Sequence, residues 1–314
     1  MKKLVIIGTS DIVEEHIKCL IELKFQILVI CSTRKKSKNL HYLTKKYNIK
    51  NSFDNFKTCE KFLKINKDDF AFFLAPRIKD TESILLKCLK YKKKIFIEKP
   101  LTNNLKFIDK IKKYENLIFV GYNRIFYQNV ILLKKRLNKK KNLFVEVSCP
   151  ENNKKKIQTN SCHIISILIF WFNRIKIINI KRNFSYILVI AKIRSKGLIS
   201  IRFNFNSSEN FCIKVIENRQ IYVLKPIEIL NIFNKMHVSK QKKLFVYNPV
   251  NSQTINEYKI NNFKPGFYKQ AKEFKQFLKK RNKFILNNIT YAKKVIEICN
   301  KIYKNSRHSQ TFQK

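Results

Sequence analysis

The sequence is poor in turn-forming and acidic residues. Among its 314 residues are four glycines, six prolines and one tryptophan, and 21 Asp and Glu stand against 67 Lys and Arg, for a net charge of +46. The common residues, such as lysine, isoleucine, asparagine and phenylalanine, are those with AT-rich codons. A mutational bias of the genome therefore explains the composition better than a function does.

The positive charge forms no basic arm or tail, because the lysines are spread along the whole chain. The spacing of aromatic and basic residues resembles no nucleic-acid-binding module. With 45% hydrophobic and 13% aromatic residues, the composition argues against a disordered chain. We therefore expect no nucleic-acid partner, although the charge favours anionic ligands by electrostatic steering.

Metal-binding and membrane-spanning patterns are also missing. The eight cysteines include no CxxC and no paired ligand spacing, so we expect no metal site. Most lie in apolar runs, as reduced thiols do. The N-terminal apolar run is too short for a signal peptide, and the most apolar later stretch, residues 163–180, contains Asn173, Arg174 and Lys176. These features predict a cytoplasmic protein with no membrane partner.

Strands and helices alternate over the first part of the chain. Helical patterns, such as the one over residues 11–23, separate apolar runs at residues 4–8, 25–31, 70–75, 94–98 and 117–121. This spacing is typical of βαβ units with a parallel sheet buried on both faces. We therefore predict a doubly wound α/β domain over residues 1–122.

The pattern changes near residue 140, where apolar runs follow one another with little helix between them. These runs are residues 143–149, 176–182, 185–194, 198–205, 211–216 and 220–225. We predict one helix at 162–172 and two late helices at 265–281 and 289–304, the last with Thr290 as its cap. The pattern indicates a mostly antiparallel α+β domain over residues 123–305, with late helices able to pack back on the first domain, and a loose tail at 306–314.

Gly8 stands at the turn between the first strand and the first helix. A dinucleotide site needs glycine there because the chain turns tightly and the pyrophosphate lies on the helix N-terminus. The G-x-G-x-x-G fingerprint is degraded, with Ser10 and Val13 in its later glycine positions, so a simple strand-to-helix turn also fits. The second strand ends in residues 31–34, CSTR, rather than in an acid, which slightly favours NADP over NAD.

The stretch FIEKPLT, residues 96–102, places Lys99 at the carboxyl end of a predicted parallel strand, the edge where open α/β sheets bind ligands. Pro100 restricts the residue before it and allows a cis peptide there. Beside a nicotinamide, such a lysine could hydrogen-bond a substrate hydroxyl and ease its deprotonation. A surface lysine before a helix-starting proline is the alternative.

EKPLT after a strand resembles the signature of the Gfo/Idh/MocA (glucose–fructose oxidoreductase / inositol dehydrogenase) family. Other segments are similar to that family in the same order: residues 6–20, 74–102, 120–129, 160–172 and 264–274. The resemblance implies an N-terminal Rossmann domain and a C-terminal α+β domain with a large, mostly antiparallel open sheet. In the family that sheet often mediates oligomers, so we expect a homo-oligomer through it.

The resemblance also implies an NAD- or NADP-dependent oxidoreductase that acts on a sugar or nucleotide sugar, of the kind used in surface-polysaccharide synthesis. Lys99 would bind the reacting oxygen, and His163 would act as acid or base. The implied cofactor-binding residues are Gly8, Thr9, Ser10, Asp11, Ile12, Ser32, Thr33, Arg34, Ala75, Pro76, Glu98 and Lys99. The implied substrate-binding residues are Lys99, Tyr122, Asn123, Arg124, Thr159 and His163.

The sequence departs from the family around His163. Many members carry an aspartate four residues before the catalytic histidine, where this chain has Thr159, and a glycine-rich turn where this chain has the polar loop 150–160. Ser166 also stands where aspartate is common. The alternative function is therefore a catalytically impaired relative that binds a dinucleotide or a sugar.

Overall fold

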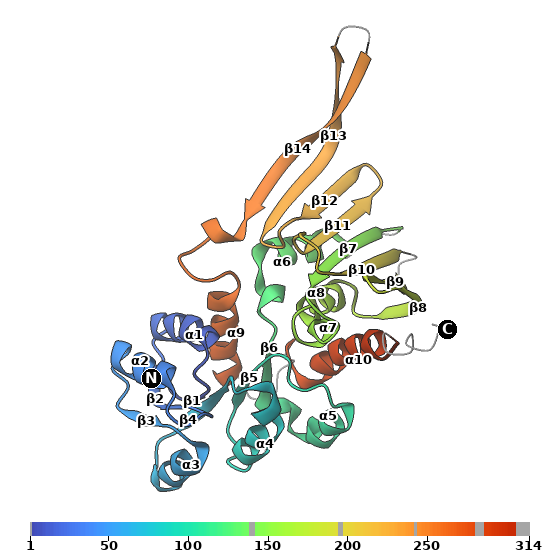
Figure 1. The fold of residues 1–314 in the computed structure, drawn as a ribbon. Coiled ribbons are helices and arrows are strands. Elements are labelled where there is room, and N and C mark those ends of the chain that lie inside the picture. The colour runs from blue at the N-terminus through green and yellow to red at the C-terminus, as the bar shows by residue number, and fades with distance from the viewer. Residues whose placement is uncertain (1, 138–141, 194–196, 242–243, 280–285, 306–314) are drawn as a thin grey trace. The chain divides into compact units, whose positions relative to one another are not determined.

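The computed structural model describes residues 2–137, 142–193, 197–241, 244–279 and 286–305 (Figure 1). These residues form two units. The first comprises the described residues up to Asn123 together with those in 266–297, and the second comprises those in 124–265 and 298–305. The tail expected at 306–314 lies outside the described residues. Within the described ranges, no helix is long and apolar enough to cross a membrane.

A six-stranded parallel sheet forms the core of the first unit. In spatial order its strands are β3 (Asn51–Phe53), β2 (Gln26–Cys31), β1 (Lys3–Ile7), β4 (Phe70–Leu74), β5 (Ile95–Glu98) and β6 (Ile118–Gly121). The middle strands are buried on both faces, as Val5 and Phe72 illustrate with no exposed surface. Such burial explains why these strands are unbroken apolar runs in the sequence, and the predicted Rossmann sheet is confirmed.

Helices cover both faces of this sheet (Figure 1). On one face lie α1 (Asp11–Glu22) and α2 (Lys38–Lys46), and on the other lie α3 (Phe56–Ile65), α4 (Ile78–Leu89) and α5 (Leu105–Ile111). A late helix, α9 (Phe267–Lys279), packs beside α1, where Lys275 Nζ donates to the Leu23 carbonyl at 2.7 Å. A segment from late in the chain thus adds to the helical cover of the first sheet.

The second unit is built on an eight-stranded sheet, confirmed as mostly antiparallel. In spatial order its strands are β14 (Leu244–Asn256), β13 (Ile229–Gln241), β12 (Gln220–Leu224), β11 (Cys212–Glu217), β7 (Phe144–Glu151), β10 (Leu198–Phe205), β9 (Tyr186–Ile193) and β8 (Ile175–Arg182). Among these neighbours, β7 and β10 run parallel. Alternate residues of β7, such as Val145 and Val147, are buried, which gives the sheet one core face.

Two helices of the second unit pack on each other. Trp171 of α8 (Cys162–Phe172) donates its indole N–H to the Val130 carbonyl of α6 (Gln128–Leu137) at 2.9 Å. Residues 162–171 of α8 are all buried, in keeping with a helix that is apolar on every side. The predicted helix at 162–172 is therefore confirmed.

The structure corrects the sequence-based boundaries in three places. Residues 229–241 and 244–256, for which no strand was predicted, form the two 13-residue strands β13 and β14. The predicted loop at 150–160 is partly regular, because β7 continues through Glu151 and α7 (Lys156–Thr159) follows. Thr290 is not a helix cap, since α10 (Ile289–Asn305) begins before it and the Asn288 side chain accepts from the Tyr291 N–H at 2.8 Å.

Candidate active site

The turn after β1 brings three strand ends together. The Gly8 N–H donates to the Cys31 carbonyl at 2.8 Å, and the Ala75 N–H donates to the Ile7 carbonyl at 2.7 Å. Gly8 has a φ of +126°, which side-chain-bearing residues rarely adopt. The chain then enters α1 after Ser10, so the first N–H groups of this helix face the carboxyl edge of the sheet.

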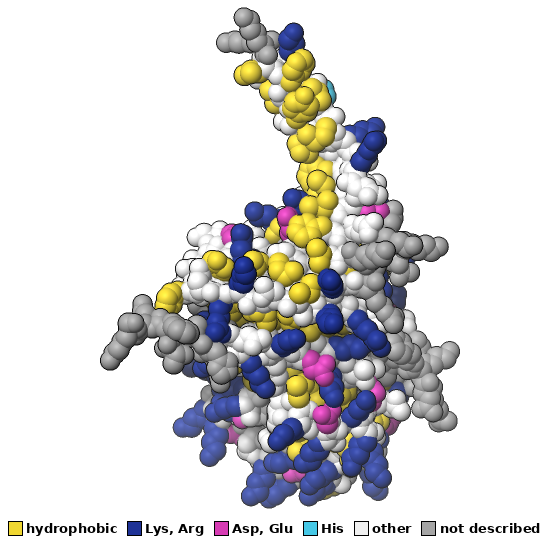
Figure 2. Space-filling model, turned by 90° about the vertical axis from the view of Figure 1, so that its right-hand side faces the viewer, with side chains coloured by type: hydrophobic (Ala, Val, Ile, Leu, Met, Phe, Trp, Pro, Cys, Tyr) yellow, Lys and Arg dark blue, Asp and Glu magenta, His cyan; other side chains and the backbone are white. Residues whose placement is uncertain are grey.

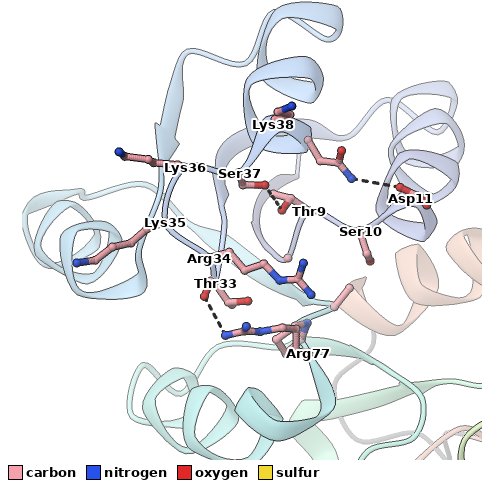
Figure 3. Close-up of a pocket in the computed structure, with 14 residues that line it drawn as sticks. Thr9, Ser10, Asp11, Thr33, Arg34, Lys35, Lys36, Ser37, Lys38 and Arg77 are labelled. Carbon is pink, nitrogen blue, oxygen red and sulfur yellow. Dashed lines mark hydrogen bonds between the residues drawn. The ribbon is translucent and has the colours of Figure 1, made fainter.

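A cavity of about 500 Å³ opens at this edge (Figure 3). It is lined by Gly8, Thr9, Ser10, Asp11, Thr33, Arg34, Lys35, Lys36, Ser37, Lys38, Asn39, Ala75, Pro76 and Arg77. Eight of the residues that the sequence assigned to the cofactor are in this wall, which combines a glycine turn, a helix N-terminus and the ends of β1, β2 and β4. That combination fits the phosphates and ribose of a dinucleotide.

Hydrogen bonds between hydroxyl groups link residues in and behind the cavity wall. Ser32, which has no exposed surface, lies behind the wall, and its Oγ accepts the Arg34 N–H at 3.0 Å. The Thr9 hydroxyl is 3.1 Å from that of Ser37 and 3.4 Å from that of Ser32. Ser37 also caps α2 by accepting the Leu40 N–H. These bonds order the loop that follows β2, where a ribose would lie.

Five basic side chains line the cavity against one carboxylate, that of Asp11. Two hydrogen bonds hold the guanidinium of Arg77: it donates to Asp80 Oδ2 at 2.7 Å and to the Thr33 carbonyl at 3.3 Å. Asp11 accepts from the Asn39 amide at 3.2 Å, at the edge of the wall (Figure 3). The excess of positive charge suits a ligand with several phosphate groups.

Six wall residues were not predicted from the sequence: Lys35, Lys36, Ser37, Lys38, Asn39 and Arg77. The position of Arg77, just after the end of β4, was the one available signal, because ligands gather at such strand ends. Three other residues assigned to the cofactor, Ile12, Glu98 and Lys99, do not line this cavity.

Glu98 and Lys99 stand at the carboxyl end of β5. Glu98 is held by His16, whose Nε2 lies 2.7 Å from its Oε1, and by the Lys99 N–H, 3.2 Å from its Oε2. The Lys99–Pro100 peptide is cis. Tyr122 and Asn123 follow β6 in the same unit and are buried, Tyr122 completely.

His163 lies in the first turn of α8, in the second unit. It is 7% exposed, and its backbone N–H donates to the Asn160 carbonyl at 3.0 Å. Thr159 ends the short helix α7, just before this turn. Arg124 belongs to the second unit and has its guanidinium 5.5 Å from the centre of the Phe211 ring, a cation–π distance.

A buried carboxylate that was not predicted from the sequence lies beside this turn. Glu151, at the end of β7, is 5% exposed and accepts from the Ser161 hydroxyl and from the Asn160 amide, the latter at 3.1 Å. Burial raises the pKa of this carboxyl above its ordinary value, although the bonds from Ser161 and Asn160 oppose the shift. Glu151 thus holds Asn160 and Ser161, the two residues that lead into α8. Thr159, just before them, supplies no carboxylate.

Comparisons with known proteins agree with this architecture. Residues 2–122 match the family model described as "Oxidoreductase family, NAD-binding Rossmann fold" (GFO_IDH_MocA). No curated protein sequence gives a significant match. Among solved structures, a dehydrogenase from Chromobacterium violaceum is similar with a TM-score of 0.76 at 13% identity, over 97% of this chain and 94% of that chain.

Two further solved structures carry more specific names. A myo-inositol dehydrogenase from Lactobacillus casei, solved with NAD(H) and myo-inositol, has a TM-score of 0.69 at 15% identity, over 98% of this chain and 95% of that one. The UDP-N-acetylglucosamine 3-dehydrogenase GnnA from Acidithiobacillus ferrooxidans has a TM-score of 0.69 at 9% identity, over 96% of both chains. These likenesses show a shared fold. The segment that runs from β1 to β6 is therefore a Rossmann domain of the NAD-binding oxidoreductase family Gfo/Idh/MocA.

Proposed function

We propose that this protein is an NAD(P)-dependent oxidoreductase that acts on a CH–OH group of a sugar or nucleotide sugar. The cavity at the Gly8 turn carries the proposal, because a glycine turn, a helix N-terminus and basic side chains meet there as a dinucleotide requires. A bound nicotinamide dinucleotide would supply hydride transfer. The protein's own residues bind the cofactor and substrate and handle the proton.

Within this proposal the cofactor is NADP. A 2′-phosphate on the adenosine ribose needs cations near the end of β2, where Arg34 follows Thr33 and Arg77 donates to the Thr33 carbonyl. The acid that would bind a free 2′-hydroxyl is missing from residues 31–34. Guanidinium groups suit a phosphate better than a hydroxyl because they donate two parallel hydrogen bonds.

Lys99 and His163 carry the chemistry in this proposal. Lys99 binds the reacting oxygen with its ammonium group and stabilises the negative charge that develops on it. His163 exchanges the proton, a task that suits imidazole near neutral pH. Tyr122, Asn123, Arg124 and Thr159 are proposed to contact the substrate. These roles rest on the matching positions in the family motifs.

For the substrate, we favour a nucleotide sugar of the kind used in polysaccharide synthesis. The net charge of +46 attracts anions, and the late segment at 264–274 resembles members that act on such substrates. A cytoplasmic location belongs to the same proposal, since all eight cysteines lie in the described ranges, seven of them are buried, and none forms a disulfide.

We further propose that the protein forms a homo-oligomer through the C-terminal sheet. Beyond the other strands, β13 and β14 pair with each other as an arm, defined as residues 235–241 and 244–250, with hydrophobic side chains along it (Figure 2). Met236, Val238, Phe245 and Tyr247 are each 48–63% exposed. A two-stranded ribbon is only marginally stable in water, so cover for these side chains would stabilise it. Light scattering after gel filtration tests this: Tyr247→Ser with Phe245→Ser should lower the mass to that of a monomer.

The first experiment is thermal unfolding with NAD(H) and with NADP(H), each at low and moderate salt. Ligand at about 100 times its Kd stabilises the folded state by about 2.7 kcal/mol. We expect a shift in Tm with NADP(H) that persists at moderate salt. A shift with neither cofactor, or one that disappears with salt as for nonspecific polyanion binding, would contradict the proposed cofactor site.

The second experiment is turnover with a panel of nucleotide sugars, using Lys99→Ala as the control. Loss of a positioned acid or base costs on the order of 100- to 10,000-fold in rate. Cofactor-dependent turnover that Lys99→Ala and His163→Ala abolish would support the enzyme. Cofactor binding without turnover on any of these sugars would instead favour the impaired binding relative, for which Thr159 in place of an acid is the supporting observation.

A further inference from the structure

His16 is a buried residue of α1 that does not line the cofactor cavity. It is 1% exposed, and three aromatic rings surround its imidazole. The ring centres of Phe73, Phe96 and Phe267 lie 4.7, 5.3 and 4.5 Å from that of His16. Because these rings leave the imidazole little freedom to turn, its Nε2 is aimed in one direction.

That direction leads to Glu98. His16 Nε2 donates to Glu98 Oε1 at 2.7 Å, and the exposed fractions of the two side chains are only 2% and 14%. The other carboxylate oxygen, Oε2, accepts from the backbone N–H of Lys99 at 3.2 Å. Each oxygen of Glu98 is therefore held by a different donor, and one of these donors is the backbone of the proposed catalytic lysine.

Gly121 leaves room for this arrangement. It pairs with Glu98 across β5 and β6, and a Cβ built on it would lie 2.9 Å from Glu98 Oε1. A side chain at position 121 would therefore press on the oxygen that His16 binds. Gly121, one of only four glycines in the chain, is therefore the residue type that this position requires.

We propose that His16 is a positioning residue for Lys99. His16 holds the Glu98 carboxylate, and that carboxylate accepts from the backbone N–H of Lys99. The backbone position from which the lysine side chain extends is therefore restricted. Misplacement of a reacting group by about 1 Å costs on the order of 100-fold in rate. The effect on turnover rests on the proposed function, whereas the effect on the Lys99 backbone does not.

The backbone effect can be measured without activity. The dipeptide Glu-Lys occurs twice in the chain, at Glu60–Lys61 and at Glu98–Lys99. Isotope labels on the glutamate carbonyl carbon and the lysine nitrogen therefore select two amide signals in a triple-resonance spectrum. In His16→Phe, which keeps an aromatic ring but removes the donor, the Lys99 amide proton should shift upfield while the Lys61 signal stays. An unchanged Lys99 signal in a folded His16→Phe protein would overturn the proposal.

The catalytic effect is tested with three variants. His16→Phe should lower kcat by about 10- to 100-fold with less than a threefold change in KM and in cofactor Kd. His16→Gln, whose amide N–H can replace the imidazole N–H, should recover most of the loss. The matched control is Ile17→Val, a change at the neighbouring buried residue of α1. If kcat falls in proportion to Tm, and to the same degree in Ile17→Val and in His16→Phe, then His16 has only a structural role.

If the natural chain turns over no sugar, the proposed function fails, and the amide signals still decide whether His16 fixes Lys99.

Discussion

The carbonyl oxygen of Ala75 occupies the space that a side chain on Gly8 would need: a Cβ built on Gly8 would lie 2.1 Å from that oxygen. The approach follows from the sheet, because the Ala75 N–H donates to the carbonyl of Ile7, one residue before the glycine. Both the space and the φ of +126° require glycine at position 8. The turn that forms the proposed cofactor cavity is therefore fixed by strand packing.

Gly8→Ala should destabilise the protein and abolish the thermal shift with cofactor. A clash with backbone combined with an unfavourable φ costs about 2–4 kcal/mol of unfolding free energy, which urea denaturation measures. Ser10→Ala is the matched control, since Ser10 lines the same cavity at an ordinary φ of −75° and its side chain makes no cap bond. A Gly8→Ala protein as stable as Ser10→Ala would show that the backbone relaxes around the methyl group.

The sequence predicted the sheet of the first unit because its strands are buried on both faces. Residues such as Ile6 and Phe73 form short runs with no polar interruption, and helical patterns separate these runs. The glycine at the first turn was predictable for a related reason, since glycine is rare here and one of the four stands where the turn demands it.

The β13–β14 arm could not be predicted in the same way. Its outer half is exposed on both faces, so residues such as Lys235, His237 and Asn248 interrupt the apolar pattern. A strand that buries neither face leaves no period-two signal. The basic cavity wall was missed for another reason: among 67 basic residues, Lys35, Lys36 and Lys38 carry no information until the fold brings them beside the Gly8 turn.

Arg34→Ala should weaken NADP(H) binding more than NAD(H) binding. Removing a charge-assisted bond to a phosphate costs about 1.5–3 kcal/mol, or roughly a 10- to 150-fold rise in Kd. We expect less than a threefold change for NAD(H), measured by titration of nicotinamide fluorescence. Arg219→Ala is the control, because it removes the same charge from an exposed turn between β11 and β12. If Arg34→Ala weakens the binding of both cofactors equally, the guanidinium binds the pyrophosphate that both share, or contributes only through long-range attraction.

Glu151 connects a sheet strand to the helix of His163, which explains why the sequence did not reveal it. Asn160 lies nine positions after it, and the polar segment between them has no feature that marks one carboxylate. Only the folded chain brings the end of β7 to the start of α8, where Glu151 accepts from the Asn160 amide and the Ser161 hydroxyl. The carboxylate thus orders this turn from the sheet side.

The raised pKa of Glu151 predicts how its contribution to stability depends on pH. Because the native state holds this proton more tightly than the unfolded state, the contribution is fully present below pH 4.5, the ordinary pKa of glutamate, and is lost as pH rises through the raised native value. Glu151→Gln keeps the size of the side chain and cannot ionise. The difference in unfolding free energy, wild type minus Glu151→Gln, should therefore fall as pH rises from 4 to 8.

Denaturant unfolding of both proteins at several pH values gives this difference and cancels the effect of every other titrating group that the two share. The partly exposed pair Lys214 and Glu146, 3.2 Å apart in the same sheet, supplies the control variant Glu146→Gln. It removes one carboxylate charge from the same sheet at a place where solvent screens it. A difference for Glu151→Gln that rises with pH would mean that the bonds from Ser161 and Asn160 outweigh burial and keep the carboxylate charged. Glu151 would then stand beside the His163 turn as a permanent negative charge, and its removal should lower turnover more at neutral pH than in acid.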